Sequence, residues 1–108
     1  MEKKLWYSGM KKDFNYKQID DIIHSRIRLA IMAILLNVEH AEFIFLKKQI
    51  NTTDGNLSIH LKKLEDAGYI AVDKFFINRK PVSSYKITNR GREAFEVYIQ
   101  RLDNFIKK

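Results

Sequence analysis

The chain has no cysteine, a single proline and four glycines among its 108 residues. Without cysteine it can form no disulfide, no thiolate-held metal site and no cysteine nucleophile. Its longest apolar run, from Leu29 to Leu36, is far shorter than the roughly 20 residues that span a membrane. The lysines near the N-terminus are not followed by an apolar segment, so we expect no secretory signal. Together these absences favour a cytoplasmic protein that does not enter a membrane.

The motifs of the common enzyme classes are also missing. The sequence contains no Gly-rich phosphate loop, no HExxH motif, no paired-carboxylate cluster and no Ser/His/Asp arrangement. No two of the three histidines, His24, His40 and His60, are three or four residues apart, so none share the spacing of a helical metal site. We therefore expect no enzyme, no cofactor and no metal. The alternative is a metal held by distant histidines across a dimer.

What is present is a folded, basic chain. Hydrophobic residues make up 45% of the sequence, which excludes a disordered chain and suffices for one domain with one core. Lysine and arginine number 20 against 13 acidic residues, for a formal net charge of +7. Such a balance favours an anionic partner, above all nucleic acid. The alternative is that the charge serves solubility alone.

Residues 53–68 contain the most informative pattern, a short amphipathic helix with recognisable ends. Thr53 can cap its start, because its hydroxyl accepts a hydrogen bond from a free backbone N–H of the first turn. Gly68 suits the position just past its end, where the backbone turns left-handed. Because each helical residue turns about 100°, the leucines of this segment fall on one side and must face a core: Leu57, Leu61 and Leu64.

The opposite side of this helix carries groups that can meet DNA. Asparagine can bond adenine, serine can bond a donor or an acceptor, and an apolar side chain suits the thymine methyl group. We expect base contacts from Asn56, Ser58 and Ile59, although a single exposed apolar residue is also ordinary on a protein surface. Three further residues are expected to bind phosphates, which position a protein without reading sequence: Thr53, Lys62 and Lys63.

The whole chain predicts a fold of the α+β class, mainly α. Two short helices, the second with a polar outer face, precede a hairpin with a basic tip, as in a winged helix-turn-helix. We expect a helix within 19–38 with Ser25 as an internal cap after a short lead-in, a polar break at 37–42, a helix at 43–50, the helix that follows Thr53, strands at 69–77 and 82–87 around a turn at 78–81, and a helix from Thr88 to about Ile106.

The last helix carries a wide apolar stripe. Its members recur alternately three and four residues apart, which is the spacing of a coiled-coil seam. One small domain would hardly cover so wide a stripe at its own end, so we interpret it as a dimer surface. The alternative is that the helix folds back and completes the core of the monomer. The expected interface residues are Phe95, Tyr98, Ile99, Leu102 and Phe105.

The sequence resembles the small MarR/ArsR-like winged-helix transcriptional regulators of bacteria and archaea over roughly residues 19–102. Each matching string is weak alone, but together they are specific in this order and spacing. The strings are His24-Ser25-Arg26-x-Arg28 in the first helix, Thr53-Asp54-Gly55-Asn56-Leu57-Ser58 at the start of the third, Phe76-x-x-Arg79-Lys80-Pro81 in the hairpin and Thr88-x-x-Gly91-Arg92-x-Ala94 in the last helix.

Residues 1–18 lie outside the resemblance; they are rich in lysine with scattered aromatics and no clear period, and we interpret them as an N-terminal arm. The apolar stripe predicts a C-terminal dimerisation helix at 89–108, and the resemblance implies a winged helix-turn-helix DNA-binding domain at 19–88. It also implies that Arg79 and Lys80, at the tip of the hairpin or wing, touch the minor groove or its phosphates. A solvated hairpin tip is the alternative for these cations. Relatives can bind small aromatic ligands, but no pocket for an effector can be placed from this sequence.

The functional hypothesis is a homodimeric, sequence-specific binder of double-stranded DNA that regulates transcription. A one-domain chain without an activation segment favours a repressor that acts by occlusion. The alternative is a winged-helix protein-protein interaction module without sequence-specific DNA binding, because a fold does not fix a function.

Overall fold

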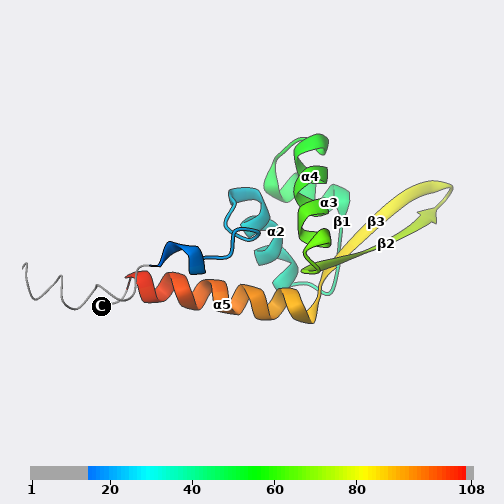
Figure 1. The fold of residues 1–108 in the computed structure, drawn as a ribbon. Coiled ribbons are helices and arrows are strands. Elements are labelled where there is room, and N and C mark those ends of the chain that lie inside the picture. Colours follow the sequence, from blue (N-terminus) through cyan, green and yellow to red (C-terminus); the bar gives the residue numbers. More distant parts are fainter. Residues whose placement is uncertain (1–14, 107–108) are drawn as a thin grey trace, which may run out of the picture.

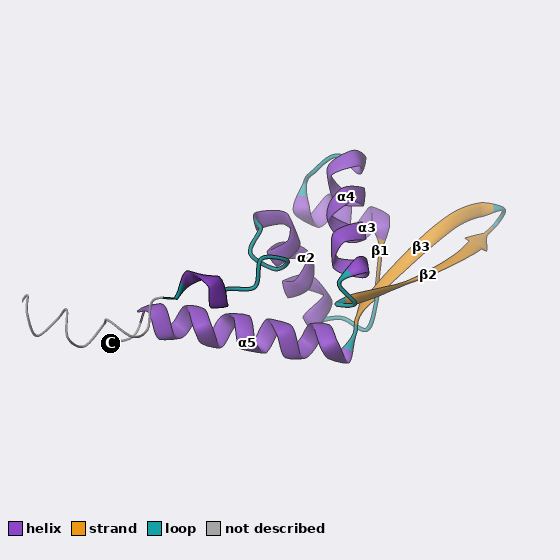
Figure 2. Ribbon diagram, viewed as in Figure 1, coloured by secondary structure: helices purple, strands orange, loops and turns teal. Residues whose placement is uncertain are grey.

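The computed structural model describes residues 15–106, which form a winged helix-turn-helix of the α+β class, mainly α (Figures 1 and 2). Most of the expected N-terminal arm, residues 1–14, and residues 107–108 lie outside this described part. Within it, no helix is both long and apolar enough to cross a lipid bilayer. The elements in chain order are the 3-10 helix η1 (Tyr16–Gln18), α2 (Arg26–Leu36), β1 (Ala41–Glu42), α3 (Phe43–Ile50), α4 (Asp54–Asp66), β2 (Ile70–Ile77), β3 (Lys80–Ile87) and α5 (Asn89–Ile106).

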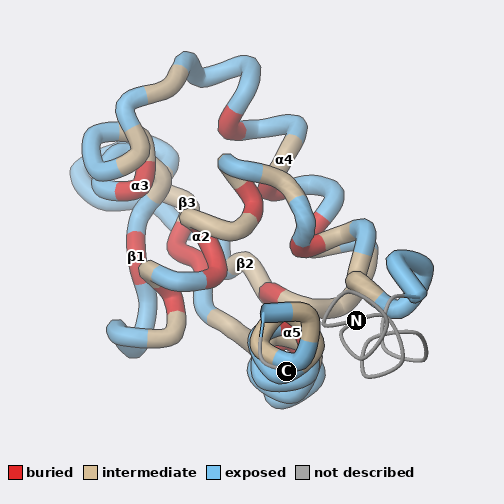
Figure 3. The backbone as a smooth tube through the Cα atoms, turned by 90° about the vertical axis from the view of Figure 1, so that its left-hand side faces the viewer, coloured by how far each residue is buried: buried red, intermediate tan, exposed pale blue. Residues whose placement is uncertain are grey.

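The core forms where α2 packs against α3, α4, β3 and α5. Figure 3 shows the buried segments of α2 and α4 turned toward one another, whereas α5 is exposed along much of its surface. Leu57, Leu61 and Leu64 of α4 are 0, 2 and 0% exposed, which confirms the face predicted for this helix. Their burial removes apolar surface from water and thereby fixes which side of α4 remains outside.

Local hydrogen bonds explain where the helices start and stop. The Ser25 hydroxyl accepts from the Arg28 N–H at 3.4 Å, and the Thr53 hydroxyl accepts from the Asn56 N–H at 3.2 Å. Gly68 has a φ of 79°, the left-handed conformation expected past the end of α4. The predicted caps at Ser25 and Thr53 and the glycine stop are therefore confirmed.

The lead-in to α2 is a turn rather than a continuation of the helix. The Asp20 carboxylate accepts from the Ile22 N–H at 2.8 Å and from the Ile23 N–H, and Ile23 is fully buried. Asp20 also accepts from the Tyr69 hydroxyl at 2.5 Å. Burial and this hydrogen bond raise the pKa of Tyr69 to about 12. The helical pattern from Ile19 thus reflects burial of the turn, not helical backbone before Arg26.

The sheet is antiparallel with strand order β1-β3-β2. Strand β1 is a correction to the sequence-based expectation, which placed only a polar break at residues 37–42. Its two residues pair with β3, Ala41 with Tyr85 and Glu42 with Ser84. So short a strand exists only because β3 supplies its partners, and the sequence within 37–42 holds no sign of that distant pairing.

The wing turn is tighter than predicted. Only Asn78 and Arg79 form it, whereas Lys80 and Pro81 belong to β3 and pair with Ile77 and Phe76. A proline is tolerated there because Ile77 and Lys80 close the turn, which leaves the next pair without hydrogen bonds between its residues. The predicted turn at 78–81 is therefore wrong in its second half, and Lys80 follows the tip rather than occupying it.

Helix α5 begins with the expected cap and packs by its first half. The Thr88 hydroxyl accepts from the Gly91 N–H at 2.9 Å and donates to the Gly68 carbonyl at 2.7 Å. Tyr98 is 2% exposed, and its hydroxyl lies 2.9 Å from His24 Nδ1. This side chain is therefore covered within one subunit and has little surface left for the predicted contact with a second subunit.

Candidate nucleic-acid interface

Over the first two turns of α4, the side opposite the leucines is exposed in the described part of the chain. Asn56, Ser58 and Ile59 are exposed, and Ile59 leaves 57% of its surface in water. Burial of the leucines on the opposite side forces this arrangement, because the two sets are separated around the helix. The structure therefore brings the three predicted base-contacting residues onto one open surface.

Gly55 leaves the start of α4 unusually open. A Cβ atom added at this position would meet no atom within 4 Å. Glycine in a helix is less favourable than alanine by roughly 0.8–1 kcal/mol. The residue thus costs stability without relieving any crowding in the described chain, and it leaves the backbone of the first turn accessible to a large ligand.

Two exposed lysine side chains near α4 form ion pairs with aspartates of this helix. Lys62 Nζ lies 3.1 Å from the Asp66 carboxylate one turn later, and hydrogen bonding to Asp66 raises the pKa of Lys62. Lys47 Nζ of α3 lies 2.8 Å from the Asp54 carboxylate at the start of α4. Exposed pairs of this kind contribute little stability. Lys62 can therefore exchange Asp66 for a phosphate at small cost.

The wing carries its arginine in an uncommon backbone conformation. Asn78 and Arg79 both have positive φ angles, 51° and 67°, as a type I′ hairpin turn requires. Glycine is favoured at the second position of such a turn, and a larger residue there costs roughly 1–2 kcal/mol. The fold alone gives no reason for an arginine here. The hairpin starts at the foot of α4 and projects away from the free end of α5 (Figure 1).

Arg28 is a structural residue that the sequence-based prediction of site residues missed. Its guanidinium is buried and donates to the carbonyls of Ile22 and Asp21 and, at 2.8 Å, to His60 Nδ1. It therefore ties the turn before α2 to α4. Burial, followed by the charges of Arg28 and Lys63, lowers the pKa of His60. A charged residue within an otherwise apolar helix pattern was the available signal.

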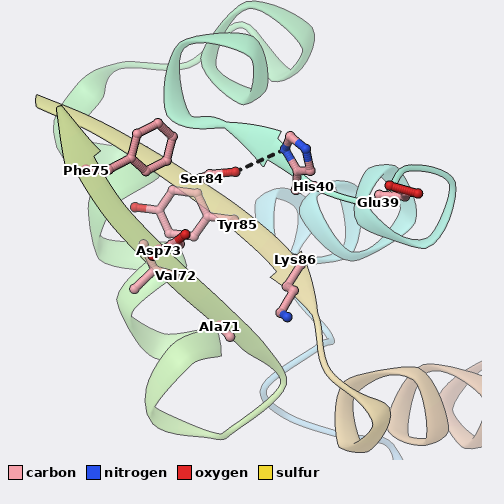
Figure 4. Close-up of a pocket in the computed structure, with 9 residues that line it drawn as sticks. All are labelled: Glu39, His40, Ala71, Val72, Asp73, Phe75, Ser84, Tyr85 and Lys86. Atoms are coloured by element: carbon pink, nitrogen blue, oxygen red, sulfur yellow. Dashed lines mark hydrogen bonds between the residues drawn. The ribbon is translucent and has the colours of Figure 1, made fainter. Parts of the chain in front are cut away.

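The three histidines lie in three different environments. His24 contacts Tyr98, His60 contacts Arg28, and His40 Nδ1 lies 3.1 Å from the Ser84 hydroxyl (Figure 4). Among residues 15–106 no three His, Asp or Glu side chains come close enough to hold a metal ion. Each ring instead links two elements of the fold.

A hollow of about 650 Å³ opens beside His40 on the sheet (Figure 4). Alternation along β2 and β3 places Asp73, Phe75 and Ser84 on one face of the hairpin. The other face holds Tyr85, which belongs to the same core as the leucines of α4. Most of the hollow therefore lies on the side of the hairpin turned away from α4, although Val72 and Tyr85 of the other face also line it. Neither Asn56 nor Ile59 is among its lining residues.

The outer side of α5 is apolar and open. Ile99 and Ile106 are 46 and 76% exposed. Phe95 and Leu102 are partly covered by the core and, with Ile99 and Ile106, line a shallow groove along the second half of the helix. Four of the five predicted dimer-interface residues, all except Tyr98, thus lie outside the buried core.

Comparison with known proteins identifies the class of domain. Residues 27–106 match the family described as winged helix DNA-binding domain. An uncharacterised protein of Methanocaldococcus jannaschii is 44% identical over 81 residues, which cover 75% of this chain and 88% of that protein. The structure of a transcriptional regulator homologue from Pyrococcus horikoshii OT3 is similar with a TM-score of 0.75 at 28% identity, covering 98% of this chain and 95% of that one.

A more distant structure shares the fold. NadR, solved in complex with 4-hydroxyphenylacetate, has a TM-score of 0.62 at 20% identity, covering 94% of this chain and 68% of that one. At this identity the likeness concerns the arrangement of helices and strands. It confirms the winged-helix architecture that the sequence predicted.

Proposed function

Because the chain belongs to the winged helix DNA-binding domain family, we propose that it is a sequence-specific, double-stranded DNA-binding regulator of transcription that acts as a homodimeric repressor. The observation that carries this proposal is the open side of α4, where Ile59 and its polar neighbours stand outside the core beside a basic wing. The similarity to a transcriptional regulator homologue supports it. On this proposal the chain is a binding protein rather than an enzyme.

The shape of the surface suits a DNA major groove. A groove about 12 Å wide admits one α-helix, and the open side of α4 presents an amide, a hydroxyl and an apolar group within its first two turns. We propose that Asn56, Ser58 and Ile59 contact base edges. We further propose that phosphates are bound by Thr53, Lys62 and Lys63, with Arg79 and Lys80 of the wing at the flanking minor groove.

We propose that the second half of α5 pairs with α5 of another subunit. The exposed row of Ile99 and Ile106, continued by Phe95 and Leu102, offers apolar area that one subunit leaves in water. Two α4 helices related by a two-fold axis would then enter successive major grooves about 34 Å apart. Occupancy of such a palindromic site would block transcription. The chain accordingly divides into an arm at 1–18, a DNA-binding domain at 19–88 and a dimerisation helix at 89–108.

Sedimentation velocity tests the dimer with a matched pair of variants. Ile99→Glu places a charge within the apolar groove and is expected to yield monomers, without disturbing the core because Ile99 is exposed. Asn104→Glu adds the same charge on an exposed position away from that groove. It should leave the dimer intact. A wild-type monomer at every concentration, or equal behaviour of both variants, would contradict the assignment.

Fluorescence anisotropy with labelled duplex DNA at several salt concentrations tests the DNA-binding proposal. If about six phosphates are neutralised, the logarithm of affinity should fall against the logarithm of salt with a slope near −5. An interaction module that does not bind DNA would give no rise in anisotropy even at low salt. That result would remove the proposal.

Three substitutions separate the roles of individual residues in the same assay. Lys62→Ala should weaken binding to all sequences alike, and Asn56→Ala should relax preference at one base position. Lys86→Ala is the matched control, because this exposed lysine lies on the face of the hairpin turned away from α4. Equal losses for the two lysine variants would show that only the overall charge matters.

A further inference from the structure

Phe76 is exposed in a way that the fold does not explain. It leaves 72% of its surface in water at the end of β2. It is paired with Pro81 across the hairpin, and strand β2 is exposed on both faces from Asp73 onward. A large aromatic side chain gains nothing for stability from this position, because its apolar surface stays in water.

Strand alternation shows which way this residue faces. Phe76 and Lys74 share a face of β2 with Val72 and Ile70, since successive residues of a strand point to opposite sides. Val72 packs against the core, and Ile70 is part of it, together with Leu64 of α4. Phe76 is therefore on the side of the hairpin that looks toward α4, whereas Ile77 is on the opposite side.

The length of the hairpin fits a DNA duplex. Its eight paired positions, from Ile70 to Ile77, extend about 25 Å at roughly 3.3 Å per residue. One helical turn of DNA is about 34 Å long, so a minor groove lies about 17 Å from the centre of the neighbouring major groove. With α4 in the major groove, the end of the wing can reach the minor groove. Lys74 lies on the same face of β2 as Phe76, and Arg79 lies in the turn that follows, so their charges complement the phosphates there.

We propose that Phe76 is an apolar wedge that inserts between base steps in the minor groove beside Arg79, so that the protein kinks its DNA. This inference rests on the proposed function and adds a deformation that the proposed function does not require. Proteins that combine a cation in the minor groove with an inserted apolar side chain kink the duplex by 20–90°. The kink favours flexible steps such as TA, and so contributes sequence preference without a hydrogen bond to a base.

The experiment uses the full chain and a duplex fragment recovered by selection from genomic DNA. The fragment carries a donor and an acceptor dye at its ends, and in a second series one adenine at a time is replaced by 2-aminopurine. Energy transfer then reports bending, 2-aminopurine fluorescence reports unstacking of one step, and anisotropy reports binding itself. The wild type is expected to bend the fragment by at least about 20° and to raise the fluorescence at a step flanking the major-groove site.

Phe76→Ala should abolish both signals while binding weakens by about tenfold, within the range for loss of one aromatic contact on a base. Phe76→Leu keeps an apolar wedge and should retain part of the bend. Ile77→Ala is the matched control, since it removes an exposed apolar side chain from the other face of the same hairpin. It should bend the DNA like the wild type.

Two results would overturn the wedge and leave the proposed function standing. One is salt-dependent binding by the wild type to a duplex that stays straight and stacked. The other is an unchanged bend with Phe76→Ala. If the wild type binds no duplex at low salt, selection yields no fragment, and both the proposed function and the wedge fail.

Discussion

Two helical glycines should respond to the same substitution with opposite signs. At Gly55 an added Cβ meets no atom within 4 Å, whereas at Gly91 it would stand 2.0 Å from the carbonyl oxygen of Tyr69. Gly55→Ala should therefore stabilise the protein by roughly 0.8–1 kcal/mol, which is the difference in helix propensity. The same variant should bind DNA less tightly if a phosphate approaches the open backbone of α4.

The cost of Gly91→Ala follows from the backbone that surrounds it. Because Cβ atoms do not approach backbone oxygen this closely, the start of α5 must move away from Tyr69. Overpacking of this kind costs about 1–3 kcal/mol. The movement also weakens the bonds from Thr88 to the carbonyls of Tyr69 and Gly68, at 3.0 and 2.7 Å, for roughly 1 kcal/mol each. Because alanine has the better helix propensity, it offsets about 1 kcal/mol of this cost, and the free energy of unfolding should fall by about 2–4 kcal/mol in total.

Urea unfolding followed by far-ultraviolet circular dichroism measures both variants against the wild type. The free energy of unfolding in water should rise for Gly55→Ala and fall for Gly91→Ala, with similar dependence on urea concentration if the unfolded state is unchanged. Equal stability of the Gly91→Ala variant and the wild type would refute the reasoning. It would mean that α5 is not seated against Tyr69 as the structure has it.

Two further predictions concern the wing and the partly buried His60. Arg79→Gly should raise the free energy of unfolding by roughly 1 kcal/mol, because glycine suits the left-handed turn. The same variant should lower the magnitude of the salt slope of DNA binding by about 1, because it removes one cation. A variant that loses stability would contradict the turn assignment. His60 should make the free energy of unfolding depend on pH. Its pKa is lowered in the folded state, so the unfolded chain takes up the proton first as pH falls. The contribution of His60 to stability is therefore complete above the unfolded pKa of 6.5 and is lost as pH falls through the folded pKa. Urea titrations between pH 7.5 and pH 5 check this, with His60→Gln expected to show a shallower decline.

The helices and the outward side of α4 could be predicted because their signals are local. Ser25, Thr53 and Gly68 mark helix ends through hydrogen bonds and dihedral angles that involve only nearby residues. The spacing of the leucines, four and then three residues apart, fixes the buried side of α4 through helix geometry alone. For the same reason, the exposure of Ile59 could be derived before any tertiary contact was known.

The elements that could not be predicted depend on distant partners. Strand β1 is defined by pairing with β3, and Arg28 is buried because carbonyls of the preceding turn and a ring from α4 accept its hydrogen bonds. Likewise, periodicity placed Tyr98 on an apolar stripe but could not distinguish a side covered by α2 from a side left for a second subunit. In the structure the Tyr98 hydroxyl contacts His24 of the same subunit.

The order of strands in the sheet has a practical consequence for handling the protein. Since β3 lies between the other two strands, β2 leaves one row of backbone donors and acceptors unpaired along its outer edge. Such an edge can template a strand from another molecule. The charged residues Asp73 and Lys74 interrupt this edge. At its aromatic end, Phe75 and Phe76, the main obstacle to such pairing is repulsion between the cations at the wing tips of two molecules. Concentrated salt screens that repulsion, so the buffers that strip nucleic acid from the purified protein should also promote wing-to-wing aggregation.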